Sequence, residues 1–166
     1  MGGIIKMIVM HTTNTVKELS AKVTQEFLMN CNDEMYQKSW PGVHIQKHLI
    51  KRGGNDHIGD VVYAFEHVGK FTIEVKMKVI KYIPEKLLEF RVFMGKIGSL
   101  VPIFLLVETE DCPEGVHLSN KFLIGWNGIG KAFDSIIGIF FPKELRDAMK
   151  EHTIIEWPLI AASLKK

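Results

Sequence analysis

The segment Phe71–Tyr82 alternates apolar and polar side chains almost residue by residue, and this two-residue period is the strongest constraint on the fold. Successive side chains of a β-strand leave opposite faces, so this segment predicts a strand with one buried and one solvated face. The apolar face comprises Phe71, Ile73, Val75, Met77 and Val79, and the polar face comprises Thr72, Glu74, Lys76 and Lys78. We therefore expect a sheet that covers an apolar interior on one side.

Five further segments with strand character accompany this one, and short connections join them. The complete series is Val43–Lys51, Ile58–His67, Phe71–Tyr82, Leu87–Met94, Val101–Thr109 and Val116–Ile124. Short connections rich in glycine and proline favour hairpins, so we expect neighbouring strands to pair antiparallel.

The region before these strands is expected to contain one more strand and two helices. Ile4–Thr12 is β-branched and apolar, which indicates a strand. Thr15 and Glu18 have the spacing of a capping box, which predicts the start of a helix that runs to about Asn30. Its expected buried positions are Val16, Leu19, Val23 and Phe27, and a second, short helix is expected over Asn32–Ser39.

A long helix is expected at the C-terminal end, over Lys143–Lys166, and Phe141-Pro142 separates it from a shorter one. The order of elements is thus a strand, two helices, six strands and a long helix. This order predicts an α+β fold, in which a curved antiparallel sheet of about seven strands wraps around the long C-terminal helix.

Length, charge and cysteine content bound the class of protein. A chain of 166 residues is expected to form one domain, residues 1–166. The net charge of +2 is too small to indicate a nucleic-acid partner. The longest apolar runs, around Ile136–Phe141 and Pro102–Val107, fall far short of the roughly 20 residues that span a bilayer. Cys31 and Cys112 form no disulfide framework, so we expect a cytoplasmic protein.

His152 and Glu156 are the most informative residues for function, because they fall on the apolar stripe of the long helix. The apolar members of that stripe are Leu145, Met149, Leu159 and Ala162. Residues four apart project from the same helix face, one turn from each other. Burying a carboxylate beside an imidazole is costly unless a metal ion or a ligand compensates.

The strands offer groups that complete a metal site with this pair. His44, Gln46 and His48 alternate along one predicted strand, so their side chains are expected on one face. Glu66 ends the neighbouring strand. Imidazole nitrogen and carboxylate oxygen are ligands that suit Zn²⁺. Two ligands from the sheet and two from the helix would then meet across the interior.

The alternative is that the pair is solvated. If Ile154, Ile155 and Trp157 face inward instead, His152 and Glu156 are partly exposed and interact only weakly with each other. Pro158 leaves the rotation of the helix open, since proline kinks a helix at such a point. The strand histidines are equally compatible with the wet outer face of the sheet.

The order of elements resembles the START-like, or helix-grip, superfamily, which includes polyketide cyclases and pollen-allergen-type ligand carriers. The resemblance rests also on Trp40-Pro41-Gly42-Val43 and on the strand–turn–strand segment Val79–Phe90, centred on Pro84. It implies a curved sheet that grips the last helix, with an apolar cavity between them. Candidates for the cavity wall are Phe71, Ile73, Val75, Leu88, Phe90, Val92, Leu105, Phe122 and Ile124. This fold hosts many functions, so it does not by itself specify one.

Within that superfamily, the histidine and glutamate pattern resembles zinc-dependent hydrolases of acylated phloroglucinols and phloretin. The resemblance implies metal ligation by His152 and Glu156 from the helix, by Glu66, and by His44 with His48 as the alternate. This chain is much shorter than those enzymes, lacks their N-terminal extension and has no obvious copy of their substrate-contacting residues.

Two classes of function follow. One is a zinc-dependent hydrolase or lyase of a small aromatic ketone, with Tyr63 or His48 in proton transfer. The other is a carrier or sensor that binds a small hydrophobic or aromatic ligand without a metal.

Overall fold

The computed structural model describes residues 7–95, 100–126 and 134–165. Residues 4–6 of the expected first strand lie outside this part of the chain. The described elements, in chain order, are β1 (Ile8–Lys17), α1 (Ala21–Asn30), α2 (Asp33–Ser39), β2 (His44–Lys51), β3 (Val61–Val68), β4 (Phe71–Ile83), β5 (Leu87–Met94), β6 (Ile103–Cys112), β7 (Gly115–Ile124), α3 (Asp134–Phe140) and α4 (Lys143–Ser163).

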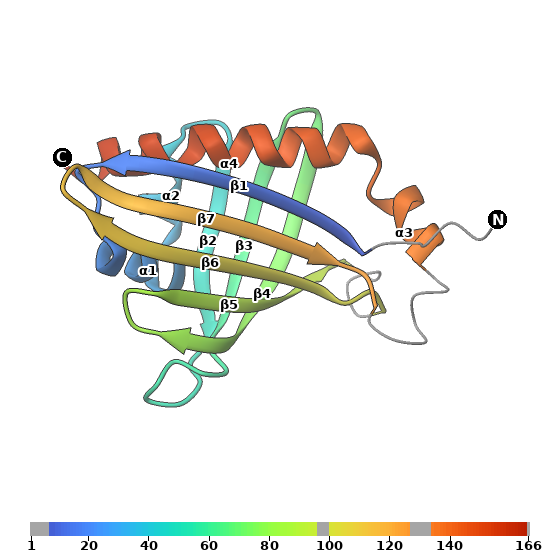
Figure 1. The fold of residues 1–166 in the computed structure, drawn as a ribbon, viewed down its shortest axis with the longest axis horizontal. Helices are drawn as coiled ribbons and strands as arrows, with labels where there is room; N and C mark the ends of the chain where they lie inside the picture. Colours follow the sequence, from blue (N-terminus) through green and yellow to red (C-terminus); the bar gives the residue numbers. More distant parts are fainter. Residues whose placement is uncertain (1–6, 96–99, 127–133, 166) are drawn as a thin grey trace.

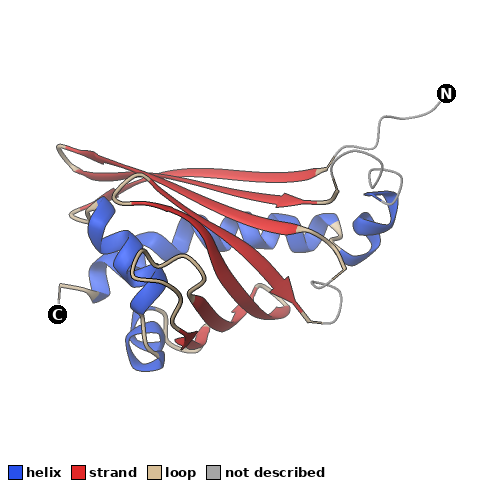
Figure 2. Ribbon diagram, turned by 90° about the horizontal axis from the view of Figure 1, so that it is seen from below, coloured by secondary structure: helices blue, strands red, loops and turns tan. Residues whose placement is uncertain are grey.

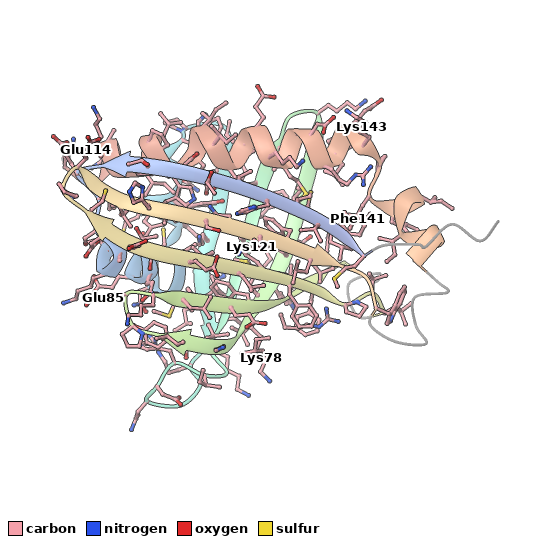
Figure 3. The ribbon with its side chains drawn as sticks, in the orientation of Figure 1. Lys78, Glu85, Glu114, Lys121, Phe141 and Lys143 are labelled. Carbon is pink, nitrogen blue, oxygen red and sulfur yellow. The ribbon has the colours of Figure 1, made fainter. Side chains whose placement is uncertain are left out.

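The seven strands form one antiparallel sheet in the order β1-β7-β6-β5-β4-β3-β2. The sheet is curved, α4 runs along its length, and α1 and α2 gather at one end (Figures 1 and 2). Phe141 is buried where α3 gives way to α4 (Figure 3), as the Phe141-Pro142 signal predicts. The expected α+β fold, a curved antiparallel sheet with a long C-terminal helix, is confirmed.

The inner face of the sheet carries the expected wall residues. All nine candidates are buried or partly buried, with Phe71 and Phe122 partly buried and packed against the core. On α4, Ile154 and Ile155 are exposed whereas His152 and Trp157 are buried, so the helix presents the predicted stripe inward. Toward its C-terminal end the buried positions are Ile160 and Ala161 rather than the expected Leu159 and Ala162. No helix in the described part of the chain has the length and apolar character to span a membrane.

The predicted capping box at Thr15 and Glu18 is wrong. Thr15 and Val16 belong to β1, which pairs with β7 through Lys17, and Val16 is buried in that pairing. The Ser20 side chain caps α1 instead, accepting a hydrogen bond from the Val23 N–H at 3.2 Å. The helix therefore begins five residues later than expected, and Val23, in its first turn, is exposed. Long pairing with β7 outweighs the local capping signal.

The connection between β2 and β3 is longer than the sequence pattern indicates, so β3 begins at Val61 rather than Ile58. Asp60, which is fully buried, organises this connection. Its carboxylate accepts hydrogen bonds from the Gly53 N–H at 2.6 Å and from Arg52 Nη1 at 2.9 Å. These bonds satisfy a charge that would otherwise be costly to bury.

The turn Trp40-Pro41-Gly42 connects α2 to β2 and thereby sets the position of His44. The Trp40 carbonyl accepts hydrogen bonds from the Val43 N–H at 3.1 Å and the His44 N–H at 3.0 Å. Gly42 has a φ of 79°, in the left-handed region, and a Cβ added there would meet no atom within 4 Å. Backbone strain, rather than a clash, is therefore what excludes other residues at Gly42.

We expect Gly42→Ala to lower the free energy of unfolding by about 1–2 kcal/mol, the cost of a left-handed conformation for an L-residue. The control is Gly138→Ala in α3, where an added Cβ also meets nothing within 4 Å and φ is not left-handed. Alanine should raise the stability there by up to about 1 kcal/mol. Urea denaturation of both variants measures the difference, and equal stabilities would contradict the assignment of strain to Gly42.

Candidate metal centre

Four residues from three elements meet on the inner side of the sheet. His44 begins β2 and lies directly opposite Glu66 of β3 in the strand pairing. His152 and Glu156 project from α4, one turn apart. His44 and His152 are buried, and the side chains of Glu66 and Glu156 are only 19% and 17% exposed. The structure thus brings together the four residues that the sequence pattern singles out as metal ligands.

The spacing of their ligand atoms suits a single metal ion. One nitrogen or oxygen from each residue lies within 4.8 Å of the other three. His44 Nε2 lies 3.4 Å from Glu156 Oε1 and 3.8 Å from Glu66 Oε2, and His152 Nε2 lies 3.3 Å from Glu66 Oε2. A tetrahedral zinc site with bonds near 2.0–2.1 Å has ligand–ligand separations of about 3.3–3.5 Å.

Two buried ring nitrogens face this cluster, one from each histidine. His44 Nε2 and His152 Nε2 are buried, and neither has a hydrogen-bond partner among the described residues. Buried polar side-chain atoms are nearly always hydrogen-bonded, so two such nitrogens in one place indicate that a partner of another kind is needed. The donor set of two imidazoles and two carboxylates therefore fits a divalent metal ion such as Zn²⁺.

A relay of hydrogen bonds from α2 fixes the tautomer of His44. The Ser39 hydroxyl donates to the Tyr36 carbonyl at 2.7 Å, so the Ser39 oxygen is left to accept from His44 Nδ1–H at 2.8 Å. The proton is thereby held on Nδ1, and Nε2 carries the lone pair that faces the cluster. An outer hydrogen bond of this kind is what orients metal-ligating histidines.

Aromatic rings hold both imidazoles in place. The Tyr36 ring stacks on His44 with centroids 3.8 Å apart and planes at 4°, and Trp40 stacks on His152 at 4.7 Å and 22°. The Tyr36 hydroxyl also donates a hydrogen bond to Glu66 Oε2. The sequence interpretation missed Tyr36, although its position three residues before Ser39 puts both on one face of α2.

Burial shifts the proton affinities of the cluster in different directions. Burial lowers the pKa of His44 to about 4, which keeps the ring neutral. Burial, aided by the nearby Glu66 carboxylate, raises the pKa of Glu156 to about 7. Burial also raises the pKa of Tyr36 well above its usual value, with the Glu66 charge adding to the effect. A neutral histidine and a carboxyl that gives up its proton near pH 7 are suited to metal binding.

The expectation that His44, Gln46 and His48 share one face is wrong, because β2 is bulged between His44 and Gln46. A bulge adds one residue to a strand and shifts the alternation that follows it. His44 and Lys47 consequently face inward and are buried, whereas Gln46 is exposed.

His48 and Tyr63, the expected proton-transfer groups, lie together outside the cluster. His48 Nδ1 contacts Asp33 Oδ1 at 2.8 Å, and the Tyr63 hydroxyl donates to Glu74 Oε1 at 3.2 Å. Their rings pack with centroids 5.2 Å apart, and neither residue lines the cavity described below. Tyr63 alternates with the buried Val62 and Ala64, which places it on the outer face of the sheet.

An apolar cavity of about 100 Å³ lies between the sheet and α4. Its wall includes Glu66, His152 and Glu156, so the cluster opens onto it. The remaining wall is mostly aliphatic and aromatic, with Ile73, Val75, Val92, Leu105, Phe122 and Ile124 among the predicted wall residues that reach it. Four further polar residues line it, and the sequence pattern singled out none of them: Tyr36, Lys47, Asn120 and Thr153.

No protein-family model and no curated protein sequence matches this chain. Solved structures do match it. Ara h 8.0201 is 13% identical with a TM-score of 0.64, and the match covers 97% of this chain and 100% of that one. Major latex-like protein 151 from Panax ginseng is 13% identical with a TM-score of 0.56, covering 88% and 97%. The protein of unknown function SA2116 from Staphylococcus aureus is 11% identical with a TM-score of 0.60, covering 96% and 94%. These likenesses identify the fold of the chain as the helix-grip fold.

Proposed function

We propose that this protein is a START-like domain that binds a small hydrophobic or aromatic ligand in its cavity and holds a zinc ion beside it. The ligands of the ion are His44, Glu66, His152 and Glu156. The observation that carries the proposal is the convergence of these four ligand atoms within 4.8 Å, at the wall of an apolar cavity. Two buried imidazole nitrogens without hydrogen-bond partners among the described residues support it further.

We propose further that the domain is a hydrolase of an aromatic, polyketide-type ketone. A bound zinc ion would polarise a carbonyl oxygen or lower the pKa of a water molecule. The apolar wall would exclude bulk water and strengthen electrostatic interactions in the cavity. Tyr36 lines the cavity and keeps its proton on Oη, because burial and the Glu66 carboxylate raise its pKa. In this proposal Tyr36 holds the proton next to the substrate, in place of Tyr63 or His48.

The first test is metal content. Purified protein should bind about one zinc ion per chain, measured by elemental analysis after dialysis, and His152→Ala should weaken zinc binding by at least about 100-fold because it removes a ligand. The matched control is His48→Ala, a histidine on the outer face that should leave zinc binding unchanged. If both variants bind zinc as the wild type does, the proposed ligand set is wrong. A wild type that binds no zinc would favour the carrier that works without metal.

The second test uses Glu156, whose burial should make metal-free protein less stable at alkaline pH. Its pKa in the folded state is about 7, against 4.5 for the ordinary side chain, so folded protein keeps a proton that unfolded protein releases between these values. The stability of metal-free wild type should therefore fall as pH rises from about 4.5 to 7. In chelator at pH 8, Glu156→Gln should melt higher than the wild type, and the difference should shrink at pH 5.

Zinc should reverse this order. Binding to the folded state alone stabilises the wild type by about 4 kcal/mol at 1,000 times the dissociation constant, and Glu156→Gln gains much less. Glu151→Gln, an exposed carboxyl-to-amide change on the same helix, should follow the wild type in both conditions. Thermal melts with zinc and with chelator measure all three proteins. Indifference of the wild type to chelator, after confirmed removal of metal, would contradict the metal centre.

The hydrolase activity is tested with an acylated phloroglucinol, by following release of the carboxylic acid. Zinc-loaded wild type should release it, and chelator or His152→Ala should reduce the rate by at least about 100-fold, since each removes the polarising ion. His48→Ala should retain the wild-type rate. Zinc-loaded protein that binds the compound without cleaving it would overturn the hydrolase and leave a metal-containing ligand carrier.

A further inference from the structure

Lys47 is a buried lysine that has no direct ion-pair partner in the described part of the protein. The residue is 4% exposed, faces inward because of the bulge in β2, and lines the cavity. Its ammonium group lies 5.2 Å from the ring centroids of both Phe27 and Tyr36. No described carboxylate forms an ion pair with it. Two aromatic faces offset only part of the cost of removing an ammonium group from water.

Asn120 presents a second unsatisfied group to the same cavity. It belongs to β7, is 4% exposed, and lies on the inner face of the sheet, two residues after the buried Leu118. Its Nδ2 atom is buried and has no hydrogen-bond partner among the described residues. A buried amide donor without an acceptor costs free energy comparable to that of a lost hydrogen bond.

These two donors come from widely separated strands, β2 and β7, that the curved sheet brings around one cavity. Each lacks an acceptor, and the rest of the wall is mainly apolar. The metal cluster adds two carboxylates, whose charges a divalent ion neutralises. With the ion bound, the metal cluster is neutral, and the Lys47 ammonium group therefore gives the cavity an excess positive charge.

We propose that Lys47 and Asn120 determine ligand specificity, and that the ligand is an apolar organic anion whose oxygens accept hydrogen bonds from both. A carboxylate or a phenolate on an aromatic body has this chemistry. An acylphenolate combines it with the ketone of the proposed hydrolase reaction. The location of this subsite beside a metal rests on the proposed function, whereas the preference for an anion rests on Lys47 and Asn120 themselves.

The test compares two probes of nearly equal shape, 2-naphthoate and 2-acetylnaphthalene, by calorimetric titration of zinc-loaded protein. Wild type should bind the carboxylate at least about tenfold more tightly than the neutral ketone, as a buried charged hydrogen bond predicts. Lys47→Met should reduce this preference to less than about threefold. Asn120→Leu should weaken naphthoate binding and leave the affinity for acetylnaphthalene equal or higher. The control is Lys78→Met, which removes an exposed lysine from the outer face of β4.

Two outcomes overturn the inference. Equal binding of the two probes by wild type would show that the cavity has no preference for an anion. A preference that survives Lys47→Met would assign it to the metal ion alone. Titration of each variant with zinc separates these results from failure of the proposed function, because Lys47→Met and Asn120→Leu keep all four metal ligands. If the wild type holds no metal, the same titrations in chelator still test the effect of Lys47. A naphthoate affinity that Lys47→Met leaves unchanged in chelator also contradicts the inference.

Discussion

The packing of α4 against the inner face of the curved sheet is the contact on which the rest of this structure depends. It buries Leu145, Met149, Trp157 and Ile160, and it carries His152 into the interior with them. Apolar burial of several large side chains outweighs the cost of taking one imidazole out of water. The helix thus keeps His152 and Glu156 buried, although these side chains alone would favour solvent. His44 and Glu66 of the sheet lie next to them. The candidate metal centre and the cavity are both consequences of this one interface.

Much of the fold and three of the candidate metal ligands were predictable because they depend on periodicity. The alternation in β4 and the helical stripe that contains His152 and Glu156 determine which side chains face inward, and the structure agrees for both. Glu66 was predictable for the same reason, since it lies two residues after the buried Ala64. A periodic pattern identifies a face whenever the element is regular. It gives no information about where an element departs from regularity.

The errors fall where regularity ends. The bulge in β2 separates His44 from Gln46 and His48, and nothing in the alternation of that segment announces it. The capping box at Thr15 is a strong local signal, yet β1 continues past it because the partner strand β7 is long enough to pair with it. Tyr36 was missed because its contacts are with His44 and Glu66 on other elements. Lys47 was missed because the bulge turns it inward, and the sequence pattern does not report the bulge.

The β2 bulge also bears on how this site tolerates changes in sequence. One extra, unpaired residue lies between the inward positions His44 and Lys47. The face on which each later side chain of β2 lies therefore depends on the bulge as well as on the order of residues. Deleting Ile45 would remove the unpaired residue and leave Gln46 opposite Phe65 and Lys47 opposite Ala64, so the inward positions would stay as they are. If Ile45 instead took the place opposite Phe65, every following side chain would exchange faces, and the Lys47 ammonium group would leave the cavity. The charge of the cavity is therefore encoded in the pairing register of a wall strand as well as in the side chains that the strand carries.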